Sequence, residues 1–287
     1  MACTNLVIKK INNSENILVD SFGRIINYLR ISVTDRCNQK CMYCSPKGVF
    51  TKLPRQDVLS FEEIYEFTKI AVSSGVTKLK LTGGEPLVRK DILYLVELLG
   101  SIQGIKDLGM TTNGLLLKKF SKQLKNAGLQ RINISLDTLS ADKYNLITKG
   151  GNINEVYGSI EAAQKAGLEP VKINCVVMPG INEYEIDAMR KFCENAGLQL
   201  QFIQVMDLSQ KRLSENLHEI FSRPPKCEFC NKLRLASNGD IFPCLYSNLC
   251  ISIRKSGSYA EALIKAVEMK PFTSNKSNFQ TMAEIGG

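Results

Sequence analysis

Short apolar segments alternate with amphipathic segments along most of this 287-residue chain, and no other feature constrains its fold as strongly. Three of the amphipathic segments end in Ala-Gly-Leu, where the glycine can supply a left-handed helix cap. Successive strand–helix units predict a parallel sheet covered by helices. A partial TIM-like barrel and an open doubly wound sheet both fit this pattern. The six segments typical of strands, rich in Val, Ile and Leu, are 28–34, 78–82, 107–111, 131–136, 170–177 and 199–206.

The helical segments have recognisable ends, and the pattern changes after residue 206. Ser60 and Glu63 form a capping-box pair that predicts a helix from about residue 61 to Gly75. The segment 207–226 is polar, and the chain closes with a short helical segment near 259–270 and a polar tail. We therefore expect an N-terminal extension (1–27), an α/β barrel (28–206) and a small C-terminal domain (207–287).

Composition and charge narrow the class of protein. No apolar run approaches the roughly 18 residues that span a bilayer, and the first residues lack the apolar stretch of a signal peptide. We therefore expect a cytoplasmic protein without membrane contact. The net charge of +9 comes from scattered Lys and Arg residues rather than a basic block, which favours a small phosphorylated ligand over nucleic acid.

Six of the ten cysteines fall into two groups. Clustered cysteines in a reducing compartment indicate metal binding or catalysis rather than disulfides. Cys175, by contrast, lies in an apolar strand segment, and we interpret it as a small core residue. The first group is Cys37, Cys41 and Cys44, and the second is Cys227, Cys230 and Cys244.

The first group directly follows the first strand segment. Thiolates are the usual ligands of iron–sulfur clusters, and three of them in one loop can hold three irons of a [4Fe–4S] cluster. The fourth iron then stays open to a ligand, as catalytic zinc keeps one position open. A zinc site is the alternative, but the only histidine, His218, is far away in the sequence.

The spacing Cys37-x3-Cys41-x2-Cys44, with Tyr43 before the last cysteine, resembles the signature of radical S-adenosylmethionine (radical-SAM) enzymes. Gly83-Gly84-Glu85-Pro86 is similar to their glycine-rich motif, in which glycines let a ligand approach the backbone and Glu85 can accept from an ammonium group. The resemblance implies a partial (β/α)6 TIM-like barrel of the radical-SAM type with a small C-terminal iron–sulfur domain. It also implies that the three cysteines are catalytic, and that the cluster cleaves S-adenosylmethionine to a 5′-deoxyadenosyl radical.

Several segments resemble one family more specifically, the GTP 3′,8-cyclases of molybdenum-cofactor biosynthesis. The similarity covers about residues 22–206 and resumes at Cys227-x2-Cys230-x13-Cys244, the spacing of that family's second cluster. The final Gly286-Gly287 is similar too. The segments that carry the resemblance include Phe22-Gly23-Arg24, residues 29–37, 81–89, Thr111-Thr112-Asn113-Gly114 and 131–137.

The resemblance implies two [4Fe–4S] clusters, S-adenosylmethionine as cofactor and GTP as substrate. The radical then takes the ribose 3′-hydrogen of GTP, and C3′ attacks C8 of guanine. A reducing electron donor and a downstream pterin-pathway enzyme are the implied partners, while a homodimer is left open. Positions that match the family's substrate-binding residues are Arg30, Lys80, Thr111, Lys172, Lys232, Leu233 and Arg234. Positions that match cofactor contacts are Tyr43, Gly83, Gly84, Glu85, Ser135 and Met206.

Departures from the family pattern leave alternatives open. The segment 207–226 is shorter than the family's, and Gln201 replaces an expected substrate-binding Arg. Cys250 is a possible fourth ligand of the second cluster, although we favour a free thiol. The main alternative is a diverged radical-SAM enzyme that acts on another nucleotide or a peptide. A metal-stapled RNA-binding protein is the non-enzymatic alternative, and it would bind zinc and show salt-sensitive binding.

Overall fold

The computed structural model describes residues 8–11, 15–44, 52–205 and 227–274. Met206, the whole segment 207–226 and the terminal Gly286-Gly287 lie outside the described residues, so the predictions made for them stay predictions. A small hairpin, β1 (Ile8–Ile11) and β2 (Glu15–Leu18), precedes the main body of the chain.

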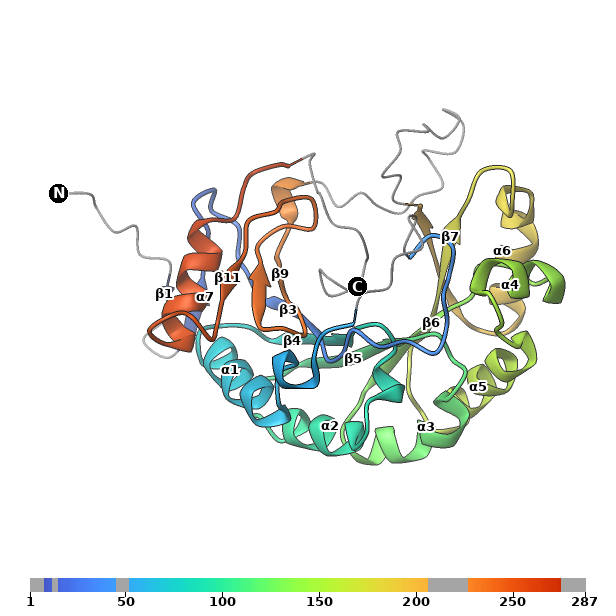
Figure 1. Ribbon diagram of the computed structural model, residues 1–287, viewed down its shortest axis with the longest axis horizontal. Helices are drawn as coiled ribbons and strands as arrows, with labels where there is room; N and C mark the ends of the chain where they lie inside the picture. The colour runs from blue at the N-terminus through green and yellow to red at the C-terminus, as the bar shows by residue number, and fades with distance from the viewer. Residues whose placement is uncertain (1–7, 12–14, 45–51, 206–226, 275–287) are drawn as a thin grey trace.

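Within the described residues, the main body of the chain is built on one curved sheet of nine strands (Figure 1). Six parallel strands follow one another without reversal from β3 to β8, and this order is that of a partial barrel. A doubly wound sheet requires a point where the strand order reverses, so that alternative is wrong. The six strands are β3 (Tyr28–Ser32), β4 (Lys78–Thr82), β5 (Asp107–Thr112), β6 (Arg131–Ser135), β7 (Val171–Val177) and β8 (Gln199–Gln204).

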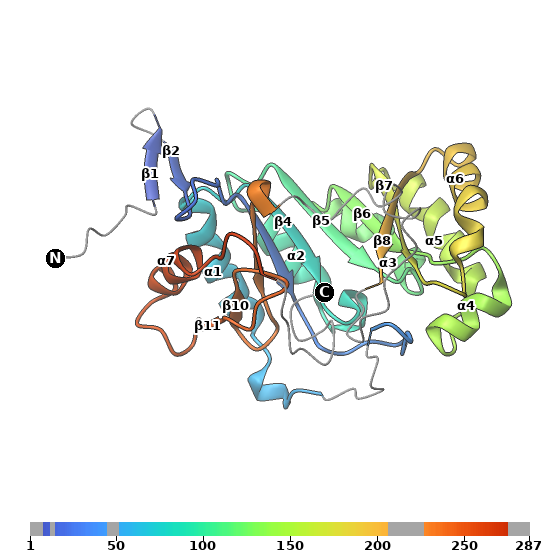
Figure 2. The same ribbon diagram turned by 90° about the horizontal axis from the view of Figure 1, so that it is seen from above.

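The helices lie along the outer, convex side of the sheet (Figures 1 and 2). Helix α1 (Phe61–Ser73) begins with the predicted capping box, in which the Ser60 hydroxyl accepts from the Glu63 amide at 3.1 Å and a Glu63 carboxylate oxygen accepts from the Ser60 amide at 2.7 Å. The three Ala-Gly-Leu helix ends are confirmed, since each glycine has a positive φ. The other helices are α2 (Ile92–Gly100), α3 (Leu117–Asn126), α4 (Ala141–Thr148), α5 (Ile153–Lys165), α6 (Ile186–Asn195) and α7 (Tyr259–Glu268). Short 3-10 turns lie at Arg55–Asp57, Pro86–Val88, Glu183–Glu185 and Cys227–Phe229.

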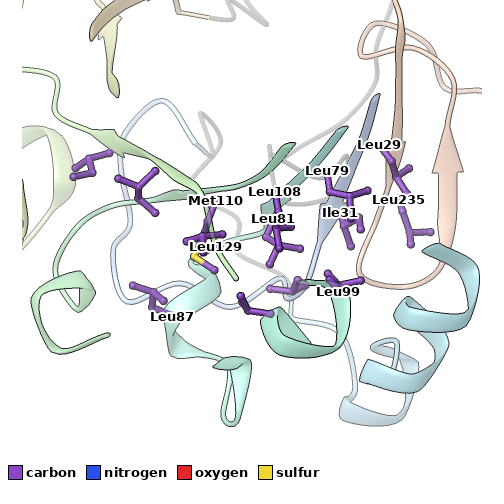
Figure 3. Packing of buried hydrophobic residues seen from close by; sticks show 14 of the residues in the cluster. Leu29, Ile31, Leu79, Leu81, Leu87, Leu99, Leu108, Met110, Leu129 and Leu235 are labelled. Atoms are coloured by element: carbon purple, nitrogen blue, oxygen red, sulfur yellow. The ribbon is translucent and has the colours of Figure 1, made fainter. Parts of the chain in front are cut away.

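The two faces of the sheet differ in chemistry because side chains alternate along each strand. Leu29 and Ile31 of β3, like Leu79 and Leu81 of β4, are fully buried among the outer helices (Figure 3). The residues between them, such as Lys80, face the inner side. Cys175 of β7 is only 3% exposed within the same core, as predicted.

The C-terminal residues continue the barrel sheet. Strand β9 (Lys232–Leu235) pairs in parallel with β3, and β10 (Asp240–Phe242) and β11 (Ile251–Ser252) extend the same edge with antiparallel pairing. Leu235 lies fully buried in the same apolar cluster as Leu29 and Ile31 (Figure 3). The predicted boundary near residue 206 therefore does not coincide with a break in the sheet or in the core.

Among the described residues, the structure contains no helix long and apolar enough to cross a bilayer.

If β9 belongs to the barrel core, Leu235→Ala should destabilise the whole described chain. The substitution leaves a cavity in a close-packed core, so we expect the free energy of unfolding to fall by about 2–5 kcal/mol. Leu146→Ala, at a position that is 62% exposed on α4, is the matched control and should change it by less than about 0.5 kcal/mol. Denaturant titration should show a single transition in each protein, and separate transitions for the two parts of the chain would contradict a shared core.

Candidate active site

The loop that carries the first cysteine group, Cys37, Cys41 and Cys44, follows β3 and docks on helix α4. The Gln39 side-chain nitrogen Nε2 donates to the Tyr144 hydroxyl at 3.0 Å, and the Met42 backbone amide donates to the Ile147 carbonyl at 3.0 Å. Helix α4 is not among the helices predicted from the sequence. These contacts show that it holds the cysteine loop in place.

Asp137 anchors the same loop from the end of β6. Its side chain accepts from the Tyr43 hydroxyl at 2.9 Å and from the Val176 amide at 2.8 Å. Burial raises the pKa of Asp137 to about 6, although both hydrogen bonds act in the opposite direction. Asp137 is not among the site residues predicted from the sequence. Its position as an acidic residue directly after a buried strand segment is the feature of the sequence that indicates such a role.

Gly83 and Gly84 bring the second loop against the cysteine loop. A Cβ atom on Gly84 would lie 2.3 Å from the Arg36 carbonyl oxygen, and one on Gly83 would lie 2.5 Å from that of Thr34. The Gly84 amide donates to the Thr34 carbonyl at 2.7 Å. The glycines are thus required for close contact between two backbone segments, in addition to any contact with a ligand.

Glu85 is buried and ties the ends of β4 and β5 together. One carboxylate oxygen accepts from the Thr112 hydroxyl at 2.7 Å and the Leu87 amide at 3.0 Å, and the other accepts from the Asn113 amide at 2.7 Å. Burial raises its pKa to about 7 against these hydrogen bonds. The Asn113 side-chain nitrogen in turn lies 3.8 Å from Cys37 Sγ, so this network reaches the first cysteine.

The thiols of the first group lie close together, as a shared cluster requires. The pKa of Cys37 is raised to about 11 and that of Cys41 further, mainly by burial and to a smaller extent by the charges of the other thiols of the group, so ligation has to displace their protons, as metal binding to thiols does. In a [4Fe–4S] cluster each of three such thiolates binds a different iron.

Basic side chains from five strands gather on the inner face of the sheet. Arg30 of β3 lies in register with Lys80 of β4 on one side and with Arg234 of β9 on the other. Lys80 is 5% exposed, and its ammonium donates to the Asn133 side-chain oxygen at 2.6 Å. We call Arg30, Lys80, Arg131, Lys172 and Arg234 the inner-face cation cluster.

The charges of this cluster act on one another. Burial and, in decreasing order, the positive charges of Arg30, Arg131 and Lys172 together lower the pKa of Lys80 to about 6, while the charge of Asp107 acts in the opposite direction. Burial and Arg30 likewise lower the pKa of Arg234 to about 9. Cations that lower one another's pKa in this way are stabilised by a bound anion.

Arg131 is a member of the cluster that sequence analysis missed. Its guanidinium forms a two-point ion pair with Asp107, with N–O distances of 2.5 and 2.8 Å. It lies over Gly109, where an added Cβ would be 3.2 Å from Arg131 Cζ, so Gly109 leaves room for it in the row beside Lys80. The signal was a Gly in the interior of a strand beside an Arg at the start of the next.

The other predicted ligand contacts occupy different positions. The Lys232 ammonium lies 5.6 Å from the centre of the Tyr28 ring. Thr111 and Ser135 are half-buried on β5 and β6. Leu233 differs from the rest because its side chain is fully buried in the core on the opposite face, so only its backbone can contact a ligand.

The second cysteine group assembles where β9 begins and β10 ends. The Cys230 amide donates to the Cys227 carbonyl at 3.1 Å, and the Tyr246 amide donates to Cys244 Sγ at 3.4 Å. Burial raises the pKa of Cys230, but the charges and hydrogen bonds of Lys270 and Lys232 together outweigh it, and the net shift is downward. Three thiols in this arrangement fit a second cluster by the same chemistry as the first.

Cys250 has different surroundings from the second group. Like Cys227 of that group it is exposed, but the charges that act on it after burial are those of Asp240 and Lys255. The structure therefore offers no support for Cys250 as a fourth ligand among the described residues.

The N-terminal residues take part in the second cysteine group. Arg24 is buried in an ion pair with Asp20 at 2.5 Å and donates to the carbonyls of Cys227 at 2.7 Å and Pro271 at 2.8 Å. Residues 20–24, predicted only as part of an extension, thus fasten the cysteine turn to the segment that follows α7.

Comparisons with known proteins show the family to which this chain belongs. The sequence profile of the radical SAM superfamily matches residues 31–193. The GTP 3′,8-cyclase of Thermodesulfovibrio yellowstonii is 39% identical, over 93% of this chain and 99% of the relative. The GTP 3′,8-cyclase of Alkaliphilus metalliredigens is 36% identical over the same shares, and that of Campylobacter curvus is 37% identical over 91% of this chain and 92% of the relative.

Solved structures of similar fold support the architecture. Streptococcus suis SuiB bound to S-adenosylmethionine matches with a TM-score of 0.65 and 17% identity, over 87% of this chain and 67% of that chain. anSMEcpe with bound AdoMet matches with a TM-score of 0.61 and 17% identity, over 84% of this chain and 77% of that chain. At this identity the likeness shows the fold alone. The profile match and the close relatives together show that the chain belongs to the radical SAM superfamily and, within it, to the GTP 3′,8-cyclase family.

Proposed function

We propose that this enzyme converts GTP to 3′,8-cyclo-7,8-dihydro-GTP, the first step of molybdenum-cofactor biosynthesis. The observation that carries the proposal is the inner-face cation cluster, whose buried Lys80 is surrounded by Arg30, Arg131 and Lys172. A triphosphate is the ligand whose charge matches such a cluster. The relatives named GTP 3′,8-cyclase support guanosine as the nucleoside.

The order of elements along the inner face supports a substrate held between two cysteine groups. Strands β3 and β9 run in parallel from the pair Tyr28 and Lys232. Cys230 precedes this end of β9, whereas the Cys37 loop follows the opposite end of β3. A strand of this length separates the two ends by roughly 17 Å. Arg30 and Arg234 lie between them.

We assign the first cluster to Cys37, Cys41 and Cys44 and a second cluster to Cys227, Cys230 and Cys244. When bound, the first cluster and S-adenosylmethionine supply the radical that removes a hydrogen atom from the substrate. Tyr43, Gly83, Gly84, Glu85 and Ser135 are the described residues that we assign to the cofactor side.

The chain itself binds, orients and shields the substrate. Arg30, Lys80, Lys172 and Arg234 hold the triphosphate, while Asn133 fixes the Lys80 ammonium at 2.6 Å. Held in this way, the ribose presents C3′ to the radical and C8 of guanine to C3′. C3′ loses a hydrogen atom and forms a bond to C8, and an electron from the reductant and a proton then complete the product. The product is therefore an isomer of GTP.

The surroundings of the reaction follow from the same assignment. We place the enzyme in the cytoplasm, where a reducing electron donor supplies the electron and a pterin-pathway enzyme consumes the product. A diverged enzyme that acts on another nucleotide or a peptide is not favoured by the relatives, which share the cyclase name over nearly their full length.

The direct test is anaerobic reconstitution with iron and sulfide, followed by incubation with GTP, S-adenosylmethionine and dithionite. We expect 5′-deoxyadenosine together with a product that has the mass of GTP but a different chromatographic retention time. GTP deuterated at C3′ should transfer its deuterium to 5′-deoxyadenosine. Cleavage of S-adenosylmethionine without any isomer of GTP would contradict the proposal and point to another substrate.

Removal of the positive charge of Lys80 should weaken triphosphate binding more than removal of the positive charge of Lys78, which lies on the same strand. Lys80→Met deletes a charge-assisted contact worth roughly 1.5–3 kcal/mol, so we expect the Kd for GTP to rise about 10-fold to 100-fold. Lys78→Met removes an exposed lysine from β4 and should change it less than about threefold. Equilibrium dialysis on anaerobic protein measures both, and equal effects would remove Lys80 from the triphosphate site.

Triphosphate binding should also take up protons. The pKa of Lys80 is about 6 in the ligand-free protein, so its side chain is mostly a neutral amine at pH 8. Bound phosphate favours the charged form and raises this pKa, so binding takes up a proton and affinity falls as the pH rises above about 6. Calorimetric titration at pH 8 in two buffers of different ionisation enthalpy measures the uptake. Lys80→Met should abolish it, and uptake that persists in the variant would exclude Lys80 as its source.

A further inference from the structure

Lys270 is a buried cation outside the inner-face cation cluster. It follows helix α7 and is 2% exposed. Its ammonium donates to the Pro243 carbonyl at 2.6 Å, to the Lys232 carbonyl at 2.8 Å and to Cys230 Sγ at 3.4 Å. The three N–H donors of the ammonium are therefore all used, and each is directed at the second cysteine group or its immediate flanks.

These contacts join the separate parts of the second cysteine group. Lys232 is two residues after Cys230, and Pro243 directly precedes Cys244. One side chain thus fixes the strand start that follows Cys230 and the turn that leads into Cys244. A third part, the turn at Cys227, is held by the Arg24 guanidinium, which donates to that residue's carbonyl at 2.7 Å.

The positive charge of Lys270 is compensated by sulfur, at Cys230 Sγ, rather than by a carboxylate of the described residues. Within the described part of the chain, no ion pair joins Lys270 to a carboxylate, whereas the buried Arg24 has Asp20. A buried charge without a counter-charge costs several kcal/mol. Thiolate sulfur at Cys230 is the anionic partner within contact distance, and a reduced cluster on that sulfur carries more negative charge still.

We infer that Lys270 is a positioning residue for the second cluster, which sets its geometry through the carbonyls of Lys232 and Pro243 and raises its reduction potential through an N–H···S contact to Cys230. The inference rests on the proposed function, because the second cluster belongs to that proposal. Hydrogen bonds to cluster sulfurs and nearby charge are established determinants of reduction potential. A cation favours the reduced form because reduction adds a negative charge beside it.

The test uses the full-length chain with Cys37, Cys41 and Cys44 replaced by Ala, so that only the second cluster can form. In this background we compare Lys270 with Lys270→Met, which removes charge and donors, and with Lys270→Gln, which keeps a neutral donor. Lys265→Met, at an exposed lysine of α7 paired with Glu261, is the matched control for loss of one positive charge. Iron content and an EPR-monitored redox titration are the readouts.

We expect about four irons per chain in the background protein. The Lys270 ammonium interacts more strongly with the reduced cluster than with the oxidised one, so its loss in Lys270→Met should lower the equilibrium constant for reduction roughly tenfold, which is about 59 mV for one electron. The midpoint potential of the second cluster should also fall in Lys270→Gln, and it should not change in Lys265→Met. Loss of iron from a Lys270 variant that keeps the background's circular dichroism and melting transition would support the positioning role.

The possible failures are distinguishable. If Lys270→Met does not fold, the measurement on Lys270→Gln decides. A wild-type midpoint potential and full iron content in whichever Lys270 variant folds would overturn the inference while the second cluster stands. A background protein that folds but binds no iron would instead overturn the assignment of the second cluster itself.

Discussion

The parallel pairing of β9 with β3 is the constraint on which the rest of the site depends. It places a strand from the last quarter of the chain beside the first strand of the barrel, in register from Tyr28 and Lys232 onward. Arg234 thereby comes alongside Arg30, and the second cysteine group comes to the opposite end of β3 from the first. Without this pairing, Arg234 and the second cysteine group would not lie beside the first strand of the barrel.

The same pairing concentrates positive charge where burial disfavours it. Lys80 is 5% exposed, and burial together with three neighbouring cations lowers its pKa to about 6. The fold tolerates this arrangement because the opposite face of the sheet buries a continuous apolar cluster that includes Leu29, Leu79 and Leu235. Buried cations that lower one another's pKa are stabilised most by a polyanion, and this is the physical reason for the triphosphate that we propose as ligand.

The sequence predicted what depends on local pattern. Spacing identified both cysteine groups, and periodicity located the six barrel strands and the start of α1. It missed features that depend on contacts between distant segments: β9 to β11 are only two to four residues long, and Arg24 meets Cys227 across more than 200 residues. Asp137 and Arg131 were passed over because a single charged residue carries no signal until its partners, Tyr43 and Asp107, are in place. Residues 207–226 lie outside the described residues, so the shortening expected there stays a prediction.

We propose that two iron–sulfur clusters lie near opposite ends of β3 on the inner side of one sheet, with the cation cluster between them. An anomalous difference map, collected at the iron absorption edge from crystals grown without oxygen, tests this arrangement. We expect two separate iron peaks, one beyond the end of β3 at Cys37, Cys41 and Cys44, the other beside the start of β9 at Cys227, Cys230 and Cys244. A single peak, or a zinc signal at either position, would contradict it.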